Sequence, residues 1–238
     1  MRRSFMGEHA QERLIRKLDL ELFLSKIISQ PTPQVRLEQY TISEQIAAKV
    51  LYLAAYANND IIGKSVLDLG CGTGRFALGA SFVGARDVVG VDIDRSAIKT
   101  ASQNSRKVGL VKNIQWINCD ISMIVGTFDT VLQNPPFGIQ TREADRAFLT
   151  KALEVGDSIY SLHNHPEFDK QLIKQLKASQ GYLQVPASSF LERFIARHNG
   201  VVTAVYAMLM TIPRMFDFHK QLKHYFVIDL YVIKKKPT

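Results

Sequence analysis

Three glycines at alternate positions follow a short apolar segment, and this pattern constrains the fold of the chain more than any other feature. The segment 66–69 has the composition of a buried strand, the sequence Gly70-Cys71-Gly72-Thr73-Gly74 follows it, and a helical pattern begins at Arg75. Glycine tolerates positive φ and lets a ligand approach the backbone closely. A helix N-terminus behind such a turn offers free N–H groups. The pattern is therefore typical of a strand–turn–helix unit that binds a ligand at the carboxyl edge of a sheet.

Strand-like and helical segments alternate along most of the chain. Repeated strand–helix–strand units favour a parallel sheet covered by helices on both faces, and right-handed crossovers make that sheet doubly wound. The last two strands have no helical pattern between them, so we expect an antiparallel pair. The sequence therefore predicts an α/β fold with a seven-stranded, mostly parallel sheet. The expected strands cover residues 65–69, 87–91, 114–118, 128–133, 158–162, 201–211 and 225–232, and the helices 75–82, 95–108, 143–154, 167–177 and 188–197.

The chain before this alternation is predicted to be helical. One amphipathic helix is expected over 10–29 and a second over 43–56, where Ser43 is the expected N-cap. A chain of 238 residues without a repeat or linker is typical of one domain. We therefore expect a single domain in which a helical extension (1–60) precedes the sheet-forming core (61–238). The apolar side chains that define the first helix are Leu14, Ile15, Leu18, Leu22 and Ile28.

The charge balance favours a polyanionic partner. The chain has 30 Lys and Arg against 22 Asp and Glu, a net charge of +8, and both chain ends are basic. Two cysteines are too few for a disulfide scaffold or a four-cysteine zinc site, and they indicate a reducing, cytoplasmic location. The longest uncharged stretch, Asn199–Pro213, has fifteen residues, fewer than the roughly 20 that a spanning helix needs. The sequence thus predicts no membrane association.

Acidic residues follow the first three strands of the expected sheet. Asp92 lies about twenty residues after the glycine turn, where an acid accepts hydrogen bonds from ribose hydroxyls. Asp68 precedes the turn and would suit an ammonium group, such as that of S-adenosylmethionine. Asp120 could reach an adenine amine, with Ile121 beside the ring. A dinucleotide stays compatible with the glycines, because Gly72 opens a G-x-G-x-x-A pattern. The residues predict a nucleoside-bearing cofactor across the first strands.

The sequence Asn134-Pro135-Pro136-Phe137 leaves the fourth strand at the same expected edge. Proline fixes φ near −65° and lacks an N–H donor, so the turn is rigid. The Asn134 side-chain oxygen and the Pro135 carbonyl can accept both hydrogens of one planar NH₂ group. Phe137 offers a flat face on which the ring that carries this amine can stack. The tetrad predicts catalysis by positioning an amine, with no metal and no cysteine nucleophile.

These motifs resemble those of class I S-adenosylmethionine-dependent methyltransferases of the Asn-Pro-Pro-[Phe/Tyr] type, which have a Rossmann-like fold. The chain is most similar to the small-subunit ribosomal RNA adenine-N6 methyltransferases of archaea and eukaryotes. Thr41-Ile42 stand where those proteins have Pro-Thr, and Ala178–Phe190 resembles an insertion. The resemblance rests on Leu37–Tyr40, Asp68–Gly72, Asp92–Asp94, Cys119-Asp120, Asn134–Gly138, Ala147–Leu149, Tyr160–His163 and Phe218–Lys220.

The resemblance implies roles for individual residues and a reaction. The implied reaction is methylation of adenine N6 in structured RNA, with Asn134, Pro135, Pro136 and Phe137 catalytic. It also implies a small zinc-bearing activator subunit that pairs with the strand 113–118. RNA phosphates are expected to be bound by Phe218, His219, Lys220 and Lys223. The implied cofactor-binding residues are Gln39, Asp68, Gly70, Gly72, Thr73, Gly74, Arg75, Asp92, Ile93, Asp120, Ile121 and Asn134.

Three alternatives stay open at this point. The same tetrad can serve protein glutamine-N5 methylation, and the basic chain ends favour RNA over protein. A non-catalytic RNA-binding or ribosome assembly factor would have the same charge but no need for Asn134 and Asp92. A nicotinamide dehydrogenase would use the glycines, but no residue supplies hydride chemistry. His163 and His165 are read as residues of a strand end rather than as metal ligands, and Cys71 and Cys119 as structural thiols.

Overall fold

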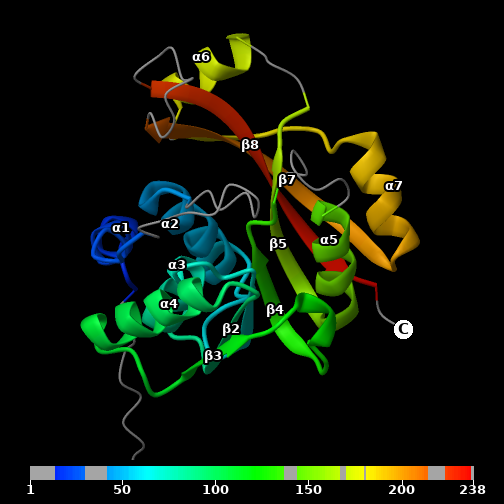
Figure 1. The fold of residues 1–238 in the computed structure, drawn as a ribbon. Helices are drawn as coiled ribbons and strands as arrows, with labels where there is room; N and C mark the ends of the chain where they lie inside the picture. Colours follow the sequence, from blue (N-terminus) through cyan, green and yellow to red (C-terminus); the bar gives the residue numbers. More distant parts are fainter. Residues whose placement is uncertain are drawn as a thin grey trace, which may run out of the picture.

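A computed structural model describes residues 14–29, 42–136, 144–166, 170–179, 181–213 and 223–236. Its centre is a single eight-stranded sheet with the order β3-β2-β1-β4-β5-β8-β7-β6 (Figure 1). Strands β1 to β5 pair in parallel, and β8, β7 and β6 continue the sheet with antiparallel pairs. The strands are β1 (Ser65–Leu69), β2 (Asp87–Asp92), β3 (Ile114–Asn118), β4 (Phe128–Gln133), β5 (Gly156–Asn164), β6 (Tyr182–Gln184), β7 (Gly200–Pro213) and β8 (Lys223–Lys235).

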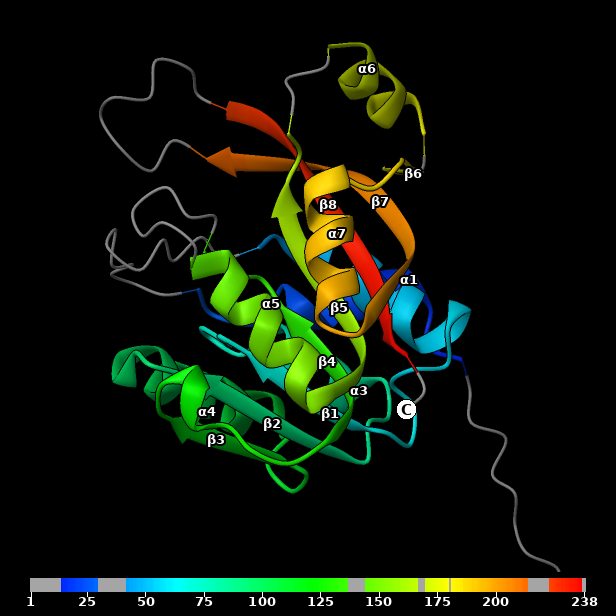
Figure 2. The same cartoon turned by 90° about the vertical axis from the view of Figure 1, so that its right-hand side faces the viewer.

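Helices cover both faces of this sheet, as Figures 1 and 2 show from two sides. One face packs against α1 to α4, and its core includes Leu51, Leu78 and Tyr160. The other packs against α5 and α7, with Leu149 and Ile195 in its core. The helices are α1 (Lys17–Leu24), α2 (Glu44–Tyr52), α3 (Arg75–Phe82), α4 (Arg95–Val108), α5 (Ala144–Val155), α6 (Lys170–Ala178) and α7 (Ser189–Arg197), with η2 (Leu53–Ala57) and η3 (Ile121–Met123).

The predicted doubly wound α/β fold is confirmed, and several element bounds agree to the residue. Strands β1, β3 and β4 and helices α3 and α4 have the predicted limits. The predicted cap of α2 is also present, because the Ser43 side chain accepts a hydrogen bond from the Ile46 N–H. The sheet has one strand more than the predicted seven. Strand β6 pairs with β7 over Tyr182–Gln184, and three residues are too few to show an alternating pattern in the sequence.

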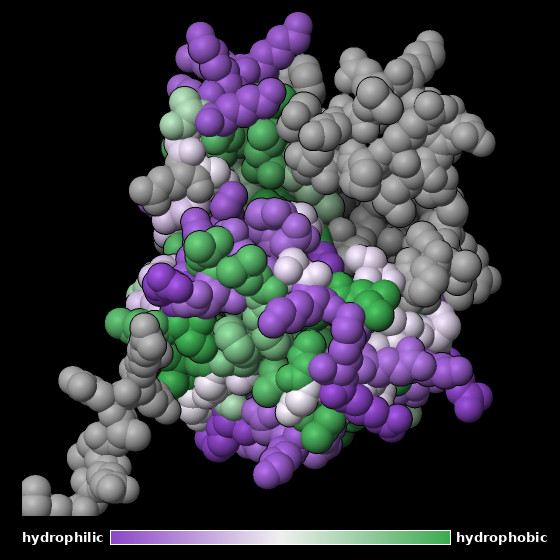
Figure 3. All heavy atoms as spheres, turned by 90° about the vertical axis from the view of Figure 1, so that its left-hand side faces the viewer, coloured by the Kyte–Doolittle hydropathy of each residue, from purple (hydrophilic) through white to green (hydrophobic). Residues whose placement is uncertain are grey.

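The first helix differs from the prediction in both its length and its buried face. Helix α1 covers only Lys17–Leu24, and Leu20, Phe23 and Leu24 on it are buried. The predicted apolar stripe is largely exposed instead. Figure 3 views the molecule from the left of Figure 1, where α1 and α4 lie, and shows hydrophobic patches (green) between hydrophilic ones (purple). The chain has apolar residues on both sides of α1, so helical spacing alone could not tell which side packs. The exposed residues are Leu14, Leu18, Leu22 and Ile28.

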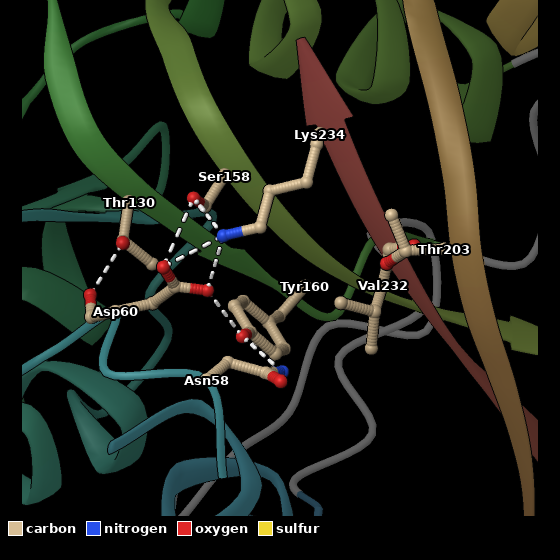
Figure 4. Close-up of polar contacts among 8 residues, drawn as sticks. All are labelled: Asn58, Asp60, Thr130, Ser158, Tyr160, Thr203, Val232 and Lys234. Atoms are coloured by element: carbon tan, nitrogen blue, oxygen red, sulfur yellow. Dashed lines mark hydrogen bonds and ion pairs between the residues drawn. The ribbon is translucent and has the colours of Figure 1, made fainter. Parts of the chain in front are cut away.

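A buried polar network fixes the C-terminal strand to the amino ends of the parallel strands (Figure 4). The Lys234 Nζ donates to both carboxylate oxygens of Asp60 at 2.7 Å. The Tyr160 hydroxyl donates to Asp60 at 2.6 Å, and burial raises the pKa of Tyr160 well above its usual value, so it stays a donor. The network lies at the edge opposite the glycine turn. It therefore has a structural rather than a chemical role.

No helix in the described ranges is both long enough and apolar enough to cross a membrane.

Candidate active site

The sheet order brings the predicted site segments to one edge. Leu69, the last residue of β1, pairs with Val91 on one side and with Gln133 on the other. The glycine turn, Asp92 and Asn134 each follow within one residue of these paired positions. The carboxyl ends of three neighbouring parallel strands therefore meet, which is where ligands bind in open α/β sheets.

The glycine turn is held by the neighbouring strand. Gly70, Gly72 and Gly74 have φ values of 73°, 53° and 85°, in the left-handed region that favours glycine. The N–H groups of Gly70 and Cys71 donate to the Val91 carbonyl at 2.9 and 2.8 Å. A Cβ at Gly74 would lie 2.4 Å from the Trp116 ring, whereas a Cβ at Gly72 would meet no atom of the described residues within 4 Å. Gly74 is thus required for packing, and Gly72 faces open space that a ligand can fill.

Asp92 joins the second strand to this turn. Its Oδ2 accepts a hydrogen bond from the Gly72 N–H at 2.8 Å, and its Oδ1 accepts one from the Asp94 N–H at 2.9 Å. Burial raises the pKa of Asp92, and these two hydrogen bonds counteract the rise. Each carboxylate oxygen keeps a further lone pair, so the side chain can still accept from a ribose hydroxyl. The ribose role predicted for Asp92 fits this geometry and stays a prediction.

Asp68 lies deeper than its neighbours. The residue is only 2% exposed. Its carboxylate accepts a hydrogen bond from the N–H of Ala77, in the first turn of α3, at 2.8 Å. Burial is the main cause that raises the pKa of Asp68 to about 7; the Ala77 hydrogen bond opposes the rise, and the charge of Asp92 adds to it. A carboxyl group in this state takes up a proton unless a cation is placed beside it. The predicted pairing with an ammonium group is consistent with this requirement.

Arg75 and Asn104 connect the turn with the N-terminal helices. The buried Arg75 guanidinium donates to the carbonyls of Ile42 and Ile27, so it contacts backbone on both sides of residues 30–41. The Asn104 amide donates to the Thr73 carbonyl in the turn at 3.1 Å, and it exchanges two 3.0 Å hydrogen bonds with the backbone of Ile28. Asn104 could not be selected from the sequence, because one asparagine in an amphipathic helix has no distinguishing pattern.

The remaining cofactor candidates lie at the ends of β2 and β3. Asp120 caps η3 by accepting a hydrogen bond from the Ser122 N–H at 2.8 Å, which lowers the pKa of its carboxyl. Its neighbour Ile121 packs partly on the core of the α5 side. Ile93 is more than half exposed beside Asp92. All three side chains border the same edge of the sheet, and their proposed contacts with an adenine ring stay predictions.

A chain of neutral hydrogen bonds lies directly behind Asn134. The buried Gln133 amide donates to the Ser161 hydroxyl at 2.8 Å, and this hydroxyl is 2.8 Å from His163 Nε2. Burial lowers the pKa of His163 to about 4, so the ring is neutral at physiological pH. Pro135, in the turn itself, is also buried. The residues that precede and support the Asn-Pro-Pro turn are therefore fixed by packing and hydrogen bonds. Ser161 was singled out only through the resemblance, His163 was interpreted as a strand-end residue, and Gln133 was missed.

Comparisons with known proteins agree with this site. A family model described as the methyltransferase small domain matches residues 46–159. The rRNA N(6)-adenosine-methyltransferase METTL5 of Danio rerio is 38% identical over 61% of this chain and 72% of the fish protein. Mettl5 of Drosophila melanogaster, with the same enzyme name, is 30% identical over 89% of this chain and 93% of the fly protein. The chain belongs to the METTL5 family.

A solved structure supports this membership. A crystal structure of a Pyrococcus horikoshii protein, provisionally named an RNA methyltransferase, superposes with a TM-score of 0.77 at 33% identity. The alignment covers 94% of this chain and 100% of that one. As a member of the METTL5 family, this chain is a class I methyltransferase, and its methyl donor is S-adenosylmethionine.

Some predicted site residues of this METTL5-family chain lie outside the described residues. They are Gln39, Phe137, Phe218, His219 and Lys220, and the side chain of Lys223 is not described either. Among the described residues, no group of three or more His, Cys, Asp and Glu side chains is placed to hold a metal ion. His165 instead pairs with Asp229 at 2.9 Å, and both cysteines are free thiols.

Proposed function

We propose that this chain transfers a methyl group to the N6 amine of an adenosine in small-subunit ribosomal RNA, in the cytoplasm. The single observation that supports this most is the meeting of the glycine turn and the Asn134-Pro135 turn at one sheet edge. The open space above Gly72 fits a bound cofactor, because among the described residues nothing lies within 4 Å of its missing Cβ. When bound, S-adenosylmethionine supplies an electrophilic methyl group on a sulfonium.

The residues of the Asn-Pro-Pro turn position the incoming amine. The Asn134 side-chain oxygen and the Pro135 carbonyl each accept one N–H of the adenine amine, so its nitrogen lone pair faces the cofactor. The target base must leave its stack to reach this edge, at a cost of about a few kcal/mol. Positioning of this kind supplies up to about 7–11 kcal/mol in favourable reactions, and the amine loses its proton to solvent after transfer.

The substrate class is tested with radiolabelled S-adenosylmethionine. Unmodified small-subunit ribosomal RNA and a total protein extract are incubated separately with the full chain. We expect label in the RNA, and N6-methyladenosine after digestion to nucleosides. Label only in protein, released as N5-methylglutamine, would contradict the RNA assignment and support the alternative that the same tetrad allows. Binding of RNA without any transfer would support the assembly-factor alternative.

We also propose that a small zinc-bearing activator subunit pairs with β3. This strand is at one edge of the described sheet, and an edge strand offers unpaired backbone groups to another chain. Ile117 on β3 and Met123 and Val125 after it are exposed, which is typical of an interface that a partner covers. Affinity purification of the tagged chain from its own cells should recover this subunit, and Ile117→Lys should prevent its recovery. Equal recovery of the subunit with the unchanged chain and with the Ile117→Lys variant would refute β3 as its binding surface.

A further inference from the structure

Two aromatic side chains and a histidine form a continuous stack along α7. The rings of Phe190 and Phe194 are 6.4 Å apart with an interplanar angle of 29°, and Phe194 stacks on His198 at 4.4 Å. The guanidinium of Arg146, from the first turn of α5, lies 5.0 Å from the Phe190 ring centroid. Phe190 nevertheless remains 46% exposed. Figures 1 and 2 both place α5 and α7 side by side on the same face of the sheet.

The surface around this stack is positively charged. Phe190, Arg193, Phe194 and Arg197 are at positions i, i+3, i+4 and i+7, so they lie on one face of α7. Both arginines on this face are exposed. The acid of this helix, Glu192, is at i+2 and points away from that face. Exposed rings flanked by cations are the combination that binds single-stranded nucleic acid, because bases stack on the rings and phosphates meet the cations.

The stack begins at the catalytic edge of the sheet. The N–H of Ser188, just before α7, donates to the Tyr231 hydroxyl at 2.9 Å. Tyr231 pairs across the sheet with Ser161, and Ser161 pairs with Gln133, the residue before Asn134. Two strand spacings, about 10 Å, therefore separate the Tyr231 and Gln133 backbones. The N-terminal end of α7 therefore packs on the second strand from β4, on the side of the sheet that α5 covers.

From these contacts we infer that Phe190, with Arg146, is a stacking platform for an unpaired base of the RNA substrate that flanks the target adenosine. The inference rests on the proposed RNA substrate. Arg193 and Arg197 continue the surface and contact the phosphates of the same strand. This assigns a role to the end of the segment 178–190, to which neither the motifs nor the resemblance gave one. Extruding the target adenosine removes it from the stack of its neighbours, and a platform beside the site would replace the stacking that a neighbouring unpaired base loses.

The test compares two labelled single-stranded RNAs, an oligoadenylate and a matched strand with abasic residues in place of its bases. Phe190→Ala should weaken binding of the full-length chain to oligoadenylate about 5- to 20-fold, because one stacked base is lost. Binding of the abasic strand should not change, since its phosphates remain. Phe190→Trp should restore oligoadenylate binding. Tyr52→Ala removes an exposed ring on the opposite face of the sheet and should have no effect on either RNA.

Thermal unfolding and cofactor affinity, measured in parallel, show that the Phe190 variants are folded. Equal oligoadenylate binding by Phe190→Ala and the unchanged chain would overturn the inference, as would an equal loss for both RNAs or no binding by the unchanged chain. A change in oligomeric mass without a change in RNA binding would assign the surface to protein contact instead. Phe190-dependent binding without methyl transfer would leave the platform standing and refute the proposed function alone.

Discussion

Replacement of Asn134 by alanine is expected to lower kcat for RNA methylation about 10²- to 10³-fold, by analogy with the loss of one positioned polar group. In the proposed reaction the amide oxygen is one of two acceptors for the adenine amine, and Pro135 supplies the other. Without it the amine is held by one hydrogen bond, and its lone pair is no longer directed at the methyl group. The affinity for S-adenosylmethionine should change little, because we expect the glycine turn and Asp92 to supply most of the cofactor contacts.

The measurement is single-turnover methylation of ribosomal RNA at saturating cofactor, with cofactor Kd determined by calorimetry. Asn134→Asp is the matched control, because aspartate keeps an acceptor oxygen of the same reach and should retain more activity than alanine. An unchanged kcat for Asn134→Ala would remove the residue from the mechanism. A loss that appears only in cofactor Kd would make Asn134 a binding residue.

The affinity for S-adenosylmethionine is expected to increase with pH up to about pH 7, and Asp68→Asn should abolish that dependence. Burial raises the pKa of Asp68 to about 7 in the free chain. If Asp68 pairs with the cofactor ammonium, binding requires the carboxylate, so the proton must leave. Below the pKa of the free chain, each pH unit then weakens binding by up to about tenfold. Above it, Asp68 is already ionised and the profile levels off.

Calorimetric titrations between about pH 5.5 and about pH 7.5 measure this dependence, and binding should release protons to the buffer. Asp120→Asn is the control, because the hydrogen bonds from Ser122 lower the pKa of Asp120 and keep it ionised throughout this range. A pH dependence that persists in Asp68→Asn would indicate Asp92 as the titrating group, since burial raises its pKa too. The ammonium role of Asp68 would then be wrong.

Much of the candidate site could be predicted from the sequence because its signals are local. The glycine turn and the Asn134-Pro135-Pro136 turn consist of consecutive residues whose backbone preferences are strong. The spacing of the alternating strands and helices then placed both turns at one edge, since parallel strands all end there. Asp94, as the cap of α4, was similarly predictable, because it bonds to a residue two positions away.

Contacts between distant residues were not predictable in this way. Asn104 bonds to Ile28 and Thr73, which are 76 and 31 residues away, and Gln133 bonds to Ser161 28 residues away. The orientation of α1 was also decided by its packing partners, because either of its apolar sides could have been buried. Strand β6 exists only through its pairing with β7.

By itself, the sequence determined the order of the elements, the two rigid turns and the chemistry they permit, because these depend on each residue and its near neighbours. The tertiary structure alone decided which face of α1 is buried, how Asn104 joins the N-terminal helix to the glycine turn, and that Arg146 of α5 lies beside the ring of Phe190 of α7. These features depend on which of many chemically equivalent partners come together, and that choice is made by packing the whole chain.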